Sequence, residues 1–89
     1  MGITVRIPSM LRQYTEQKSE IVLEGKTVRE VLENLKGRFP AIDAQVFSSP
    51  ISLSLIFCIN DKDVRLLEGL NTPIEEKDTL SMILALSGG

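Results

Sequence analysis

Alternating apolar and polar residues predict two strands at the start of the chain. Apolar side chains occupy every second position across residues 3–7, the period of a strand buried on one face. Pro8 ends this strand because it cannot donate to a ladder. Ile21 and Leu23 repeat the alternation before a turn at Gly25, so we expect the two strands to pair as a hairpin. The connection between them is expected to pack one helical turn against the core through Met10, Leu11 and Tyr14.

A helix is predicted next. Thr27 and Glu30 form a capping box, in which each side chain satisfies a backbone N–H at the helix start. Pro40 disfavours helical geometry at the preceding residue, so the helix should end near residue 39. Residues 41–47 are expected to form a second short turn and residues 48–50 a loop. The helix carries one apolar stripe, formed by Val28, Val31, Leu32, Leu35 and Phe39.

The second half of the chain predicts three more strands. Alternation across residues 55–59 is followed by a tight turn at residues 60–63, where Asn and Asp are favoured. Residues 64–67 are expected to form a short return strand. The last strand should cover residues 79–86, with Leu80 and Met82 among its inward residues.

The order of these elements, β, β, α, β, short β, β, predicts an α+β fold. One helix can cover only one face of a sheet, so the other face should stay open. We expect a β-grasp roll in which the first and last strands lie parallel at the centre of a mixed sheet. The domain should comprise residues 1–86, followed by a flexible diglycine tail at 87–89.

Composition narrows the setting of this 89-residue chain. Its 10 basic and 12 acidic residues are intermixed and give a net charge of −2, which argues against a nucleic-acid partner. Its apolar runs are too short to cross a membrane, and residues 1–6 resemble no signal peptide. We therefore expect a soluble cytoplasmic protein. One cysteine permits no internal disulfide, and the absence of histidine removes the commonest general base.

The predicted open face carries a small apolar group. Strand phase directs Ile56 and Cys58 outward from one strand and Ile83 and Ala85 outward from its neighbour. A contiguous group of this kind suggests partner docking, whereas cover by a loop would make it ordinary packing. Cys58 has no evident cation to stabilise a thiolate, so packing is favoured over reactivity. No metal site is predicted.

The chain ends in Leu86-Ser87-Gly88-Gly89. Two glycines without Cβ atoms form a narrow extended segment that can thread a channel and present the Gly89 carboxylate to another protein's active site. The alternative is an ordinary terminus that ends in small residues.

Several segments together resemble the prokaryotic ubiquitin-like sulfur carriers, which include the small subunit of molybdopterin synthase, the thiamine-pathway carrier and, most similar, the carrier for cysteine biosynthesis. The segments are residues 7–12, 60–65, 69–73 and the Gly88-Gly89 end.

This resemblance implies a protein that is not itself an enzyme and binds no cofactor. A ubiquitin-activating-type adenylyltransferase would use ATP to adenylate the Gly89 carboxylate, and a sulfur donor would convert it to a thiocarboxylate. The sulfur would pass to a synthase, and a metallopeptidase could release the product. Alternatives are a molybdopterin synthase small subunit and a ubiquitin-like modifier that forms isopeptide bonds through Gly89.

Overall fold

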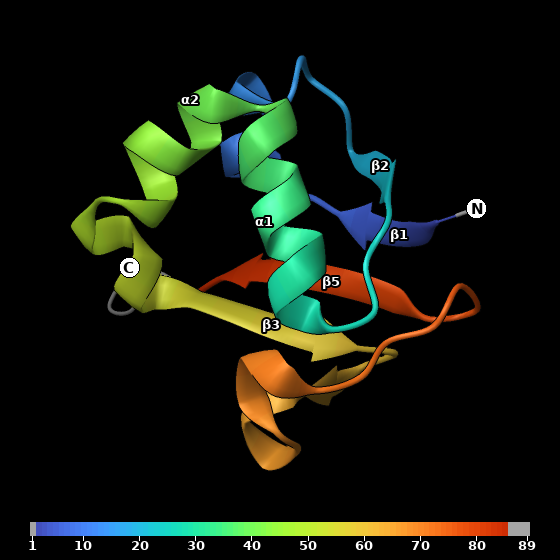
Figure 1. The fold of residues 1–89 in the computed structure, drawn as a ribbon. Helices are drawn as coiled ribbons and strands as arrows, with labels where there is room; N and C mark the ends of the chain where they lie inside the picture. Colours follow the sequence, from blue (N-terminus) through green and yellow to red (C-terminus); the bar gives the residue numbers. More distant parts are fainter. Residues whose placement is uncertain (1, 86–89) are drawn as a thin grey trace.

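A five-stranded mixed sheet with one long helix across a single face forms the core of the computed structural model (Figure 1). The structure describes residues 2–85. The strands lie in the order β2-β1-β5-β3-β4. Their bounds are β1 Ile3–Arg6, β2 Glu20–Leu23, β3 Leu55–Ile59, β4 Lys62–Asp63 and β5 Thr79–Leu84.

The pairing of the strands confirms the predicted topology. β1 pairs antiparallel with β2, so that Val5 lies opposite Ile21, and parallel with β5, so that Val5 also aligns with Leu80. All three side chains are buried. The central strands therefore belong to the two ends of the chain, and the core closes only when both ends are in place.

Helix α1, Val28–Arg38, packs its apolar stripe onto the sheet, as predicted. The Thr27 Oγ1 accepts the Glu30 N–H at 3.2 Å. The Glu30 carboxylate accepts the N–H of Lys26 at 2.9 Å, one residue before the cap, so the reciprocal bond of the capping box is displaced by one position. Phe39 is buried just after the helix ends.

Short helical turns fill the connections. These are η1 Ser9–Tyr14, α2 Pro40–Ile42, η2 Asp43–Phe47, η3 Pro50–Ser54, η4 Val64–Leu66 and η5 Gly69–Asn71. The turn η1 lies where one was expected and buries Leu11, but Met10 is 57% exposed, so its predicted contact with the core is wrong. No helix in residues 2–85 is long and apolar enough to cross a membrane.

The return strand predicted at residues 64–67 is wrong. The paired segment is β4, and the chain leaves the sheet immediately afterwards. The Asp63 carboxylate accepts the Arg65 N–H at 2.8 Å, which starts the 3₁₀ turn η4 and directs Val64 into the core. A local side-chain hydrogen bond thus competes successfully with the ladder.

A tight turn precedes β4, as predicted, but it is shorter than residues 60–63 because Lys62 and Asp63 already pair with β3. Asn60 and Asp61 have φ values of 47° and 74°. Two consecutive residues in the left-handed region match the twist of a two-residue hairpin, and Asn and Asp tolerate this geometry better than most residues. The Asn60 side chain also accepts the Thr79 N–H at 3.0 Å, which ties this turn to the start of β5.

Candidate functional site

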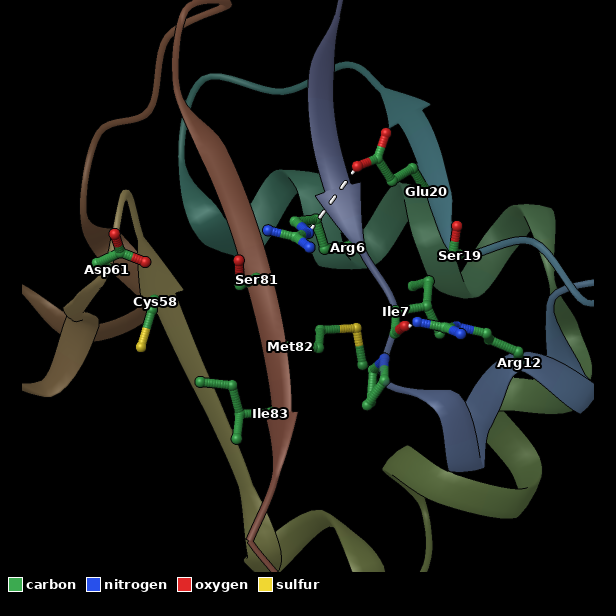
Figure 2. Close-up of a pocket in the computed structure, with 11 residues that line it drawn as sticks. Arg6, Ile7, Arg12, Ser19, Glu20, Cys58, Asp61, Ser81, Met82 and Ile83 are labelled. Atoms are coloured by element: carbon green, nitrogen blue, oxygen red, sulfur yellow. Dashed lines mark hydrogen bonds and ion pairs between the residues drawn. The ribbon is translucent and has the colours of Figure 1, made fainter.

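The face of the sheet opposite α1 contains a hollow of about 540 Å³ (Figure 2). Cys58 and Ile83 lie on one side of it and Arg12 on the other, with Arg6 and Glu20 at its upper edge in the view. The hollow therefore crosses the two central strands and their neighbours. It lies on the face where docking was predicted.

The register of β3 against β5 brings three of the predicted docking residues together. Ile56 pairs with Ile83, and Cys58 pairs with Ser81, the position two residues before Ile83. Ile83 is 43% exposed, Ile56 is half-buried and Ala85 is exposed. We call Ile56, Cys58, Ile83 and Ala85 the exit patch. Its role in docking stays a prediction.

The exit patch borders the point where the chain leaves the sheet. β5 ends at Leu84, which pairs with Leu55 at the beginning of β3. The Ala85 N–H then donates to the Ser54 carbonyl at 2.8 Å and extends the pairing by one residue. The predicted threading segment Leu86-Ser87-Gly88 and the predicted reaction site at Gly89 lie outside the described residues. The structure therefore gives the place from which this segment starts.

Cys58 is better covered than its outward phase suggested. Its side chain borders the hollow, yet the residue is only 8% exposed. Burial raises the pKa of the thiol above its ordinary value of 9.0, and the carboxylates of Asp63 and Asp61 raise it further, against a smaller opposing effect of Arg65. Cys58 is therefore a protonated thiol at neutral pH and a poor nucleophile.

Charged side chains lie around the rim of the hollow but do not form a cluster. Arg6 lies 3.9 Å from Glu20 across the β1–β2 pair, and both are largely exposed. The Arg12 Nε donates to the Ile7 carbonyl at 2.9 Å, which fixes the guanidinium beside the hollow. Asp61 lies on the opposite side. Arg6 and Glu20 lie on the outward phase of the first two strands, whereas Arg12 reaches the hollow from η1.

Asp63 and Asp78 serve local structure. Asp63 holds Arg65 in an ion pair of 2.6 Å, and this partner lowers the pKa of the carboxyl. Asp78 accepts the Glu75 N–H and the Asn60 side-chain amide, both at 2.8 Å, and so shapes the turn that leads into β5. Within residues 2–85, no group of three His, Cys, Asp or Glu residues could hold a metal ion.

A mixed sheet with its terminal strands parallel at the centre and one helix across a single face defines the β-grasp, or ubiquitin-like, class. The ThiS family model matches residues 5–89, and the chain belongs to this family. Sulfur carrier protein CysO of Mycobacterium tuberculosis is 32% identical, with all of both chains covered. The chain is therefore a homologue of sulfur carrier proteins.

Solved structures agree with this assignment. The crystal structure of the BexX/CysO complex from Amycolatopsis orientalis contains a chain that is 31% identical, with a TM-score of 0.84 over 98% of this chain and 99% of that one. Small archaeal modifier protein 1 from Methanosarcina acetivorans is 27% identical, with a TM-score of 0.82 over 98% of this chain and 95% of that one.

Proposed function

We propose that this protein carries sulfur as a thiocarboxylate on Gly89 and donates it to a biosynthetic enzyme. The proposal rests on the match to the ThiS family model, which extends through Gly89. A relative that aligns over the full length of the chain is a sulfur carrier protein. The protein is then a co-substrate that is consumed and regenerated rather than a catalyst.

The chemistry begins with activation of a poor electrophile. A Gly89 carboxylate oxygen attacks the α-phosphorus of ATP, and pyrophosphate leaves. A sulfide then attacks the carbonyl carbon of the acyl-adenylate, AMP leaves, and the product is a thiocarboxylate. The ATP is bound by a ubiquitin-activating-type adenylyltransferase, and the carrier itself holds no cofactor. The thiocarboxylate sulfur next attacks an electrophilic carbon of an acceptor bound by a sulfur-accepting synthase, where it displaces a leaving group or adds to a double bond that also takes up a proton. Hydrolysis of the resulting acyl–sulfur bond releases the product and restores the Gly89 carboxylate.

The arrangement of the described residues supports this division of labour. β1 pairs with the first half of β5, and β3 pairs with β5 up to its last residue, so the start of the terminal segment has a defined position. The open face beside it offers the exit patch to a partner. Because the titratable side chains of the hollow include no thiolate or histidine, chemistry at Gly89 would depend on groups that the partner enzyme supplies.

We assign the carried sulfur to the biosynthesis of cysteine or a related metabolite. If the product stays joined to Gly89, a metallopeptidase would release it. This pathway assignment rests on the sequence resemblance to carriers of that type.

The test is conversion of the purified protein by its activating enzyme with ATP and sulfide. Intact-mass spectrometry should show a gain equal to the exchange of one oxygen for sulfur, located on Gly89 by fragmentation. Omission of ATP is the control and should leave the mass unchanged. An unchanged mass with an activating enzyme that is active on another carrier would contradict the proposal, as would sulfur found on Cys58.

A covalent modifier is the second candidate, favoured by the similarity to a small archaeal modifier protein. In that role Gly89 would form an isopeptide bond with a lysine of another protein. Digestion of cell lysate should then yield lysine-containing peptides that carry the C-terminal residues of this chain. A lysate free of them, in cells that accumulate the thiocarboxylate, would leave sulfur transfer as the function.

A further inference from the structure

The turn η3, Pro50–Ser54, places apolar side chains in solvent beside the chain exit. Leu53 is 89% exposed, more than any other large apolar residue in the described part of the chain, and Ile51 is exposed as well. Leu53 directly precedes Ser54, whose carbonyl accepts the Ala85 N–H at 2.8 Å. Figure 1 shows the turn at the end of the sheet where β5 finishes. A strongly exposed leucine thus lies next to the last paired residue of β5.

Serine side chains hold this turn in place. The Ser49 Oγ accepts the Ile51 N–H at 3.2 Å and donates to the Val46 carbonyl at 3.0 Å. The Ser52 hydroxyl donates to the Ser49 carbonyl at 2.8 Å. Pro50 adds a fixed φ at the first position of the turn. Leu53 is therefore presented by an ordered turn, which reduces the entropy that a partner would have to overcome.

The chain segment that contains the turn is uncharged, and the charged side chains that line a hollow together with its Ser52 come from α1. Residues 44–60 contain no Asp, Glu, Lys or Arg in a chain that is 25% charged overall. The exit patch continues this uncharged surface onto β5. A partner surface that fits it is apolar, because charged groups there would be desolvated without a counter-charge.

The length of the terminal segment limits where a partner can lie. Residues 86–89 can span at most ~14 Å beyond Ala85. Leu53 is one Cα step, ~3.8 Å, from Ser54, which pairs with Ala85. An enzyme that holds the Gly89 carboxylate in its active site must therefore approach the fold within a radius that includes Leu53.

From this placement we infer that Leu53 and Ile51 on η3 form a contact for the enzyme that activates Gly89, through an apolar surface on that enzyme. The inference rests on the proposed function and extends it to a surface outside the exit patch. It concerns affinity between the two proteins. The carboxylate chemistry itself does not involve η3.

The chain offers a matched control. Leu66 is 80% exposed and also lies in a 3₁₀ turn, η4. That turn follows β4, which pairs with Cys58 and Ile59. These two residues lie at the C-terminal end of β3, whereas Leu55 lies at its N-terminal end, beside the chain exit. Leu53→Asp and Leu66→Asp therefore make the same chemical change at similarly exposed leucines, but only the first lies beside the chain exit.

The experiment is ATP–pyrophosphate exchange by the activating enzyme at increasing carrier concentration. For Leu53→Asp we expect the half-saturating concentration to rise about tenfold or more, the scale of a lost interface anchor, with the maximal rate unchanged. Leu66→Asp should stay within about twofold of wild type, as is usual for an exposed site. Leu53→Met, which keeps an apolar side chain, should restore most of the affinity. Melting curves verify that each variant is folded.

The inference is overturned if Leu53→Asp saturates the enzyme like wild type, or if both aspartate variants are impaired equally. A defect that appears only when sulfur passes to the acceptor also overturns it. Absence of exchange with the wild-type protein contradicts the proposed function itself. Normal exchange with wild type and with Leu53→Asp contradicts only the inference about η3.

Discussion

Ile83→Asp tests whether the exit patch is the surface that the activating enzyme covers. The substitution places a carboxylate at the centre of the patch, directly opposite Ile56 and two residue pairs from Cys58. In the free protein the new charge can reach water because Ile83 is 43% exposed. In a complex the same charge would be enclosed by the partner.

The structure allows the cost to folding to be separated from the cost to binding. Full burial of an isoleucine side chain contributes ~1.5–3 kcal/mol, and just over half of Ile83 is covered, so the variant should lose ~1–1.5 kcal/mol of stability. For a domain of this size each 1 kcal/mol corresponds to ~4–8 °C in melting temperature. Desolvating an unpaired carboxylate at an apolar interface should cost at least ~2 kcal/mol, or roughly thirtyfold in affinity.

The assay combines a melting curve with ATP–pyrophosphate exchange at several carrier concentrations. Val22→Asp is the matched control. Val22 is 58% exposed on β2, opposite Thr4 on the same face of the sheet but at its far edge. Both variants should melt several degrees below wild type, but only Ile83→Asp should require a much higher concentration of carrier.

Wild-type saturation by Ile83→Asp would refute the docking assignment. Equal impairment of Val22→Asp would also refute it, because the effect would then follow charge on the whole face. A collapse of the melting temperature well beyond the expected range would show that Ile83 contributes to the core despite its exposure in the structure.

Further variants separate chemistry from folding. Deletion of Gly89 should abolish thiocarboxylate formation and leave the melting curve unchanged; sulfur transfer at the normal rate would contradict the role of this carboxylate. Cys58→Ser should keep most of the activity. Burial raises the pKa of Cys58, so the folded thiol holds its proton more tightly than the unfolded one, and this contribution to stability is lost as pH rises above 9.0. For the same reason, alkylation of Cys58 by iodoacetamide should be slow at neutral pH. Rapid alkylation at pH 7 would contradict that assignment. Leu32→Ala should cost ~2–5 kcal/mol in urea unfolding, and Thr27→Ala ~1 kcal/mol, whereas a neutral result at either site would show that the cavity or the cap is compensated.

Local interactions explain why much of the fold was predictable. The alternation in β1, β2, β3 and β5 follows from a strand's period of two, and the stripe of α1 from its period of 3.6. The Thr27 cap and the turn at Asn60 depend on side chains within a few residues of the backbone groups they serve. The same strand phases placed Ile56 and Ile83 on one face before their pairing was known.

Tertiary structure decided the features that depend on distant residues. The outward phase of Cys58 did not reveal that it is almost covered, because burial depends on side chains from other strands and from the β4 hairpin. The end of β4 is set by competition between Asp63 and the ladder. The meeting of η3 with the end of β5 joins residues about 30 positions apart, and no sequence period encodes such a contact. Periodicity determines which way a side chain points, whereas packing determines what it meets there.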